Sequence, residues 1–140
     1  MFKLHDMLEK DCIRLAETEL NLLLLMKDSS YPWFVLVPKR ENIKEMFQLS
    51  ENEQALFTKE SAFLAEQLFA CFEADKMNIA ALGNMCPQLH IHHIVRYKSD
   101  KSWPAPIWGK FPIEAYSKEE IELLIKKVKP VLNSAFTFRK

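Results

Sequence analysis

Residues 88–93 have the sequence Gln-Leu-His-Ile-His-His and hold three of the four histidines of this chain. They run on into Ile-Val-Arg-Tyr, and because β-branched and aromatic residues favour strands, we expect a strand over residues 88–97. Successive side chains of a strand point to opposite faces. Gln88, His90 and His92 are therefore expected in a row on one face. Two imidazoles beside a carboxamide indicate a reactive surface rather than a core surface.

The composition indicates one globular domain. The 140 residues are 49% hydrophobic and 11% aromatic, which is enough to bury a core and is not typical of a disordered chain. Lys plus Arg equals Asp plus Glu at 19 each, so no broad field attracts a nucleic-acid polymer or an acidic membrane. A small anionic ligand is still compatible, because a local site can be positive on a neutral protein.

Cysteine usage and hydropathy predict a soluble cytoplasmic protein. Cys12, Cys71 and Cys86 form no Cys-x-x-Cys pair and are odd in number, a pattern typical of reduced thiols. The charged N-terminal residues lack the apolar region of a signal peptide. The longest apolar runs, residues 22–26 and 33–37, are too short to cross a bilayer.

The first forty residues predict a short helix followed by a β-hairpin. Apolar positions between residues 7 and 16 indicate the helix. Residues 20–26 and 33–37 are expected to be strands, joined by a segment rich in turn residues. Pro38 should end the second strand, because proline donates no hydrogen bond to a sheet.

Two capping boxes mark the main helices. The box at Ser50 opens a helix expected to end near Glu73, with apolar residues at helical spacing. The box at Ser117 opens a final helix that Pro130 is expected to stop.

A third strand is expected over residues 77–82, with a turn at Gly83-Asn84 leading toward the histidines. Strands joined by short turns around one helical interval favour an α+β fold. We expect an antiparallel sheet of about five strands with one long and one C-terminal helix, all in a single domain over residues 1–140.

Three kinds of site fit two histidines on one face. A neutral imidazole, with a pKa of about 6.5, can attack phosphorus and form a covalent phosphoramidate. A second histidine about 6–7 Å along the strand can then support the phosphate and the leaving group. A metal site would need a third ligand, and residues 94–99 contain no carboxylate. The third possibility is a purely structural pair of histidines. The polar row favours the first interpretation.

The stretch from Asn78 through the Gly83-Asn84 turn to His92 resembles the histidine triad (HIT) superfamily of nucleotide hydrolases and transferases, in particular its small bacterial members. The segments 31–40 and 102–109 resemble the same proteins, so the resemblance covers about residues 10–110. It implies a HIT-like fold and cleavage at an α-phosphate through a covalent nucleotidyl-histidine. Diadenosine polyphosphates and nucleoside phosphoramidates are the implied substrates.

The resemblance assigns roles to the histidine row. His90 matches the nucleophile, and His92 matches the residue that supports the phosphate and the leaving group. Gln88 stands where the first histidine of the triad would be, and its amide can both donate and accept hydrogen bonds. If Gln88 is a weakened triad member, Gln88→His should preserve or raise activity. His93, on the opposite face, is outside the triad.

Three further residues are candidate nucleotide or phosphate contacts. Asn84 matches a polar turn residue near the phosphates, although Met85 follows where many relatives have Ser or Thr. Asn78 can reach the nucleotide or can be a simple strand-end residue. Asp28 lies near the position where relatives bind ribose hydroxyls, and Asp-Ser-Ser is also an ordinary turn.

The resemblance also implies that the protein forms a homodimer and binds a small nucleotide as its substrate. It implies no required cofactor. Mg²⁺ could accompany a polyphosphate substrate. The segment Trp103–Trp108 is a candidate to reach the second subunit, or a loop that packs on its own chain. An alternative function is a nucleotide-binding or interaction module with weak or no catalysis, which Gln88 and Met85 both suggest.

Overall fold

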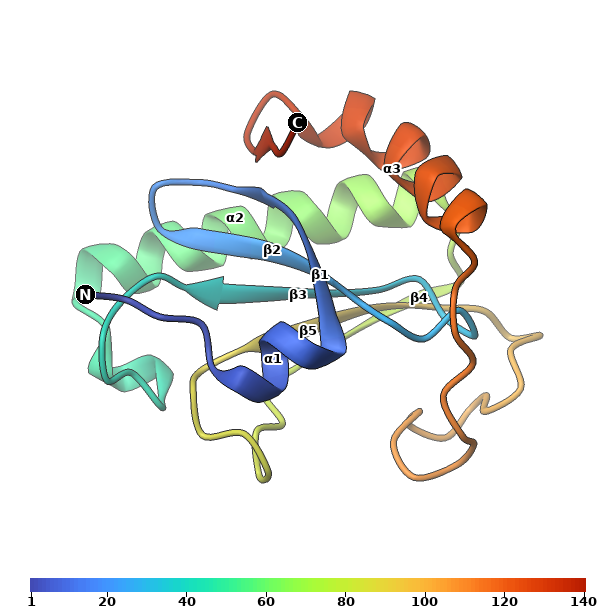
Figure 1. The fold of residues 1–140 in the computed structure, drawn as a ribbon, viewed down its shortest axis with the longest axis horizontal. Helices are drawn as coiled ribbons and strands as arrows, with labels where there is room; N and C mark the ends of the chain where they lie inside the picture. The colour runs from blue at the N-terminus through green and yellow to red at the C-terminus, as the bar shows by residue number, and fades with distance from the viewer.

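The computed structural model describes residues 1–140 and contains one six-stranded antiparallel sheet with the strand order β4-β5-β3-β2-β1-β6 (Figure 1). The strands are β1 (Cys12–Glu17), β2 (Asn21–Met26), β3 (Trp33–Pro38), β4 (Lys76–Ala80), β5 (Ile91–Arg96) and β6 (Thr137–Phe138). The helices are α1 (Asp6–Asp11), α2 (Glu51–Cys71) and α3 (Lys118–Leu132), with a short 3₁₀ helix η1 (Met46–Gln48). The predicted α+β class is confirmed.

The sheet separates two cores. Helices α2 and α3 cover one face, and α1 lies on the other with the loop that leads into β5 (Figure 1). Phe34 and Val95 point into the first core, where Leu64 and Val128 of the helices meet them. Val35 and Ile94 point into the second core, which also contains Leu8 of α1. Strand alternation therefore sends neighbouring residues of β3 and β5 to different layers.

Several elements form where the sequence predicts them. Strands β2 and β3 pair as the expected hairpin, and Pro38 is the last residue of β3. The Ser50 and Ser117 hydroxyls accept hydrogen bonds from the main-chain N–H of Glu53 and Glu120, completing both capping boxes. None of the helices is long and apolar enough to cross a membrane.

The helix expected over residues 7–16 is wrong beyond Asp11. Cys12–Glu17 form strand β1, which pairs with β2 and carries an irregularity between Arg14 and Ala16. Apolar residues in so short a segment fit a helix and a strand equally well by spacing alone. The first five residues of β2 are buried, so their main-chain groups need hydrogen bonds along both edges of the strand, and β1 supplies those of the second edge.

Pro130 does not end the final helix, as the sequence suggested. The helix α3 contains Pro130 and continues to Leu132. Proline removes one backbone hydrogen bond, but the fully buried Val128 and Leu132 hold the last turn against the sheet. The chain then turns back and adds β6, which was not expected, beside β1.

Candidate active site

His90 and His92 lie next to each other on the α1 side of the sheet. His92 is in β5 between Val35 of β3 and Ala80 of β4, and His90 precedes the first residue of that strand. The centroids of the two rings are 5.0 Å apart, with an angle of 78° between the planes. The predicted adjacency of the two imidazoles is therefore present.

The main chain fixes the orientation of His90. Its Nδ1 donates to the carbonyl oxygen of Gln88 at 2.7 Å. In the neutral imidazole this places the proton on Nδ1 and leaves the lone pair of Nε2 available. Nε2 makes no hydrogen bond within the chain and is not among the fully buried atoms. His90 thus has the tautomer that a nucleophile attacking through Nε2 requires.

His92 has the opposite tautomer. The indole N–H of Trp33 donates to Nδ1 of His92 at 2.9 Å, so the proton of the neutral ring is on Nε2. Nε2 is buried and makes no hydrogen bond of normal geometry, although a main-chain contact with Leu82 acts to raise the pKa of the ring. Burial, and then the neighbouring His90, lower the pKa of His92 to about 4. At neutral pH His92 therefore offers one buried, uncharged N–H donor.

His93 lies on the other face of the sheet, as strand alternation predicts. Its Nε2 accepts from the Ser61 hydroxyl of α2 at 2.7 Å, and its Nδ1 donates to the Ile91 carbonyl at 3.1 Å. Burial lowers the pKa of His93 to about 4. Both ring nitrogens have partners, so His93 is a packed residue of the first core.

A mainly apolar cavity of about 370 Å³ opens beside the two imidazoles. Leu8 of α1, Met26 of β2 and Trp33 of β3 contribute to its walls. Trp108 closes another side and packs edge-on against His92, with ring centroids 5.1 Å apart. The size and lining suit a flat aromatic group such as a nucleobase.

A second, more polar cavity of about 380 Å³ lies on the other side of His90. Lys44, Glu45 and Gln88 line it, and Asn84 and His90 border both cavities. His90 therefore stands at the boundary between an apolar cavity and a polar one whose lining includes the ammonium group of Lys44 and the carboxylate of Glu45. This arrangement suits a ligand with an aromatic part and an anionic part.

Gly83 allows the loop before β5 to approach His90. A Cβ atom at this position would lie 2.8 Å from the carbonyl oxygen of Cys86 and 3.1 Å from Cε1 of His90. The first distance is too short for any side chain unless the loop moves. The predicted Gly83-Asn84 turn is thus packed directly against the imidazole.

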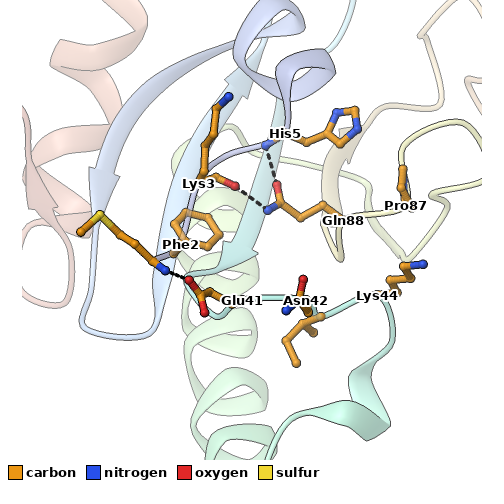
Figure 2. Close-up of a pocket in the computed structure, with 10 residues that line it drawn as sticks. Phe2, Lys3, His5, Glu41, Asn42, Lys44, Pro87 and Gln88 are labelled. Carbon is orange, nitrogen blue, oxygen red and sulfur yellow. Dashed lines mark hydrogen bonds and ion pairs between the residues drawn. The ribbon is translucent and has the colours of Figure 1, made fainter.

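Gln88 is not part of the row expected from the strand pattern. Strand β5 begins at Ile91, so alternation does not govern the direction of Gln88. Its side-chain Oε1 accepts from the main-chain N–H of His5 at 2.8 Å, and its Nε2 donates to the Lys3 carbonyl at 2.9 Å (Figure 2). Gln88 supports His90 through its main-chain carbonyl and not through its amide.

Of the three predicted nucleotide or phosphate contacts, only one lies beside the imidazoles. Asn84 is exposed and borders both cavities, next to Met85, of which 83% is exposed. Asn78 lines neither cavity, and its Oδ1 accepts from Arg96 at 2.7 Å. Asp28 is buried, and its Oδ1 accepts from the main-chain N–H groups of Ser30 and Glu114. The structure brings Asn84 to His90 and His92 but not Asn78 or Asp28.

Arg96 positions the loop that carries Trp108. Its guanidinium is buried and binds both carboxylate oxygens of Asp100, the Asn78 side chain and the Ala105 carbonyl. It also lies 5.6 Å from the centre of the Trp103 ring. The segment Trp103–Trp108 therefore packs on its own chain in this structure.

Three parts of the cavity wall were not singled out from the sequence: α1, Trp33 and Trp108. Trp33 lies in the segment 31–40, whose resemblance to the family gave it no role, and Trp108 lies in the segment 103–108, which was expected at the second subunit or on its own chain but not at the cavity. The metal alternative lacks a third ligand, because no group of three or more His, Cys, Asp or Glu side chains is placed to hold an ion.

Solved structures of bacterial histidine triad proteins match nearly the whole chain. The protein from Marinobacter aquaeolei VT8 is 44% identical, covers 96% of this chain and 98% of its own, and has a TM-score of 0.94. The protein from Sinorhizobium meliloti 1021 is 39% identical over 94% and 98%, with a TM-score of 0.91. The protein blr8122 from Bradyrhizobium japonicum is 37% identical over 92% and 96%, with a TM-score of 0.90.

The comparison with curated proteins gave no match. Residues 7–99, which include most of α1, both imidazoles and most of the apolar cavity, match the family model of the HIT domain. The chain therefore belongs to the histidine triad (HIT) family.

Proposed function

We propose that this protein is a nucleotide hydrolase or nucleotidyl transferase that cleaves at an α-phosphate through a covalent nucleotidyl-His90. The proposal rests above all on the state of His90. Its Nδ1–H is held by the Gln88 carbonyl, and its Nε2 is free at the boundary of the two cavities. An oriented neutral imidazole of this kind is an effective nucleophile near pH 7.

In the first half-reaction the Nε2 lone pair of His90 attacks the α-phosphorus. A P–N bond forms while the bond from phosphorus to the leaving group breaks, and the leaving group takes that electron pair and a proton from solvent water. The Gln88 carbonyl stabilises the positive charge that develops on the ring. The buried Nε2–H of His92 is free to donate to a phosphate oxygen or to the leaving atom.

In the second half-reaction an acceptor attacks the phosphorus and the P–N bond breaks, which returns the electron pair to Nε2 of His90. With water as the acceptor the product is a nucleoside monophosphate. With another nucleophile the same step is a transfer. Closure of the apolar cavity by Trp108 would limit the access of water.

The two cavities suggest how the substrate is divided. The apolar cavity would take the base, and the polar cavity with Lys44 and Asn84 would take phosphates or the leaving group. Adenosine phosphoramidate and diadenosine polyphosphates both have this form. Asn78 and Asp28 would act indirectly, through Arg96 and through the turn at Glu114. No resident cofactor is proposed, and Mg²⁺ would enter only with a polyphosphate.

The test is to incubate the protein with adenosine phosphoramidate, an aminoacyl-adenylate mimic and diadenosine polyphosphates, and to measure AMP release. An acid-labile AMP adduct on His90, trapped by rapid quenching and located by mass spectrometry, is expected. His90→Ala should give neither product nor adduct, and His93→Ala is the control that keeps the imidazole row intact. If wild type turns over none of these substrates, the proposal is rejected.

The second candidate function is a nucleotide-binding module without efficient chemistry. Two observations favour it: the Gln88 amide is engaged away from His90, and the exposed Met85 supplies no hydroxyl to the phosphates. Tight binding of AMP by a protein that forms no histidine adduct would support this module over the enzyme.

We also propose a homodimer in the cytoplasm. Strand β4 is an edge of the sheet, and Ile79, Leu82 and Met85 along it and just beyond it are exposed apolar side chains. Burial of these side chains against a second copy would remove them from water. Light scattering after gel filtration would give the mass of the particle, and a mass of one chain would reject the dimer.

A further inference from the structure

Gln88, which stands where the triad has its first histidine, makes hydrogen bonds through both its main chain and its side chain. The Gln88 carbonyl holds Nδ1 of His90, while the Gln88 amide holds the N-terminal segment. We propose that Gln88 is a positioning residue that fastens residues 3–5 and so sets the α1 wall of the nucleotide cavity. This inference rests on the proposed function, since it concerns the affinity of that same site.

The contact between Gln88 and the N-terminal segment is specific. Oε1 accepts from the N–H of His5 at 2.8 Å, and Nε2 donates to the carbonyl of Lys3 at 2.9 Å, so one planar amide serves two main-chain groups two residues apart (Figure 2). The two residues are 83 and 85 positions away in sequence. The ammonium group of Met1 pairs with Glu41, but both groups are exposed, and such pairs contribute little.

The fastened segment leads directly into the cavity wall. His5 is the N-cap of α1, and its Nδ1 accepts from the main-chain N–H of Met7 at 3.0 Å. Met7, Leu8 and Asp11 of this short helix line the apolar cavity. A six-residue helix is not stable by itself, so its place depends on its attachments. Buried Leu4 and Leu8 provide the apolar attachment, and Gln88 provides the polar one.

Glutamine suits this task better than the histidine it replaces. The amide oxygen and nitrogen lie side by side at the end of the side chain, one an acceptor and the other a donor. The two nitrogens of an imidazole point away from each other, so one ring cannot serve both Lys3 and His5. Under this proposal Gln88→His breaks the attachment and weakens the enzyme. This expectation differs from that for a weakened triad member, for which Gln88→His should preserve or raise activity.

The first experiment compares Gln88→Ala, Gln88→Glu and Gln88→His with wild type for AMP binding by calorimetry and for kcat and KM with adenosine phosphoramidate. Loss of two hydrogen bonds should raise the Kd for AMP and the KM about tenfold in Gln88→Ala. Gln88→Glu, which keeps the acceptor for His5, should lie between Gln88→Ala and wild type. The larger effect should fall on the KM rather than on the kcat at saturating substrate, because the Gln88 carbonyl still holds His90.

The matched control is Gln54→Ala. Gln54 is also a partly buried glutamine that donates to a main-chain carbonyl, that of Leu49, and it lies away from both cavities at the start of α2. It should lower stability slightly and leave the Kd for AMP unchanged. Equal shifts in the Kd for Gln54→Ala and Gln88→Ala would mean a general loss of stability and would overturn the proposal.

The second experiment does not depend on activity. Amide hydrogen exchange should accelerate in residues 4–11 of Gln88→Ala, and β5 should keep its protection. Unchanged exchange in these residues overturns the fastening role even if activity falls. Faster exchange without any change in the Kd for AMP overturns the link to the cavity. If wild type binds no AMP at all, the proposed function and this link both fail, while exchange still decides whether Gln88 holds the segment.

An increase in kcat for Gln88→His, or a collapse of kcat with unchanged KM for Gln88→Ala, would also overturn the proposal. Either result would place the side chain of residue 88 in the chemical step rather than in the cavity wall.

Discussion

The indole N–H of Trp33 donates to Nδ1 of His92 at 2.9 Å, and this bond decides which nitrogen of His92 carries the proton. His90 is held through a donating Nδ1 and His92 through an accepting Nδ1, so the two adjacent rings have opposite tautomers. One ring can attack through Nε2 while the other donates from Nε2. Two neutral imidazoles of the same type thereby acquire different roles from their hydrogen-bond partners.

Trp33→Phe should lower kcat about tenfold, because it removes the bond that keeps the proton of His92 on Nε2 and is worth about 1 kcal/mol. The measurement is kcat with adenosine phosphoramidate, together with nitrogen NMR of the His92 ring. Tyr31→Phe is the control, since it removes the buried hydrogen bond to Ser102 and leaves His92 untouched. An unchanged kcat and tautomer in Trp33→Phe would contradict the assignment.

Stability should fall between pH 6.5 and pH 4. Burial lowers the pKa of both His92 and His93 to about 4 in the folded protein, while the unfolded chain titrates near 6.5. The unfolded state therefore binds more protons in this window. The stability is fully present above pH 6.5 and is lost as the pH falls toward 4, by up to roughly 1.4 kcal/mol per pH unit for each histidine.

Urea unfolding at several pH values between 7 and 4.5 measures this slope. His93→Phe removes one of the two titrating groups and should reduce the slope by about half. A slope that is the same with and without His93 would show that its imidazole does not stay neutral in the folded protein.

Arg96→Met should destabilise the protein by about 3 kcal/mol, because it leaves the buried Asp100 carboxylate unpaired. It should also loosen the loop of Trp108 and raise the Kd for AMP. Denaturant unfolding and tryptophan fluorescence are the measurements. The double variant Arg96→Met with Asp100→Leu should recover part of the stability but not the binding. Full recovery of binding would show that the loop does not need the guanidinium.

The opposite faces of His92 and His93 could be predicted because strand alternation is local and both residues lie in β5. The position of Gln88 could not, because it precedes the strand and its partners Lys3 and His5 are more than eighty residues away. Strand β1 escaped prediction for a related reason: a six-residue segment takes its conformation from β2 and β6 beside it. Long-range hydrogen bonds, which leave no periodic trace in the sequence, determine both features.

Alanine substitutions should rank the three histidines of the β5 segment. His90→Ala should abolish turnover, since no other group at this position can form the P–N bond. His92→Ala should lower kcat by about 10²–10⁴-fold, because it removes a buried donor. His93→Ala should retain kcat and lose stability, since its hydrogen bond to Ser61 is lost. Circular dichroism would confirm folding. A folded but inactive His93→Ala beside an active His90→Ala would reverse the assignment.

Gly83→Ala should damage the site although alanine adds only one carbon. The new Cβ would lie 2.8 Å from the Cys86 carbonyl oxygen, so the loop must move. The same Cβ would lie 3.1 Å from Cε1 of His90, so the movement should also displace the imidazole. We expect kcat to fall by at least about tenfold and stability to fall by about 1–3 kcal/mol.

Gly109→Ala is the matched control for Gly83→Ala. The φ angle of Gly109 is 74°, so alanine is strained there, but its Cβ would meet no atom within 4 Å. It should cost about 1 kcal/mol of stability and leave kcat unchanged. Because the two variants share the same chemical change, a larger loss of kcat in Gly83→Ala isolates the contact with His90. Equal kcat values in both variants would mean that the loop before β5 does not position the nucleophile.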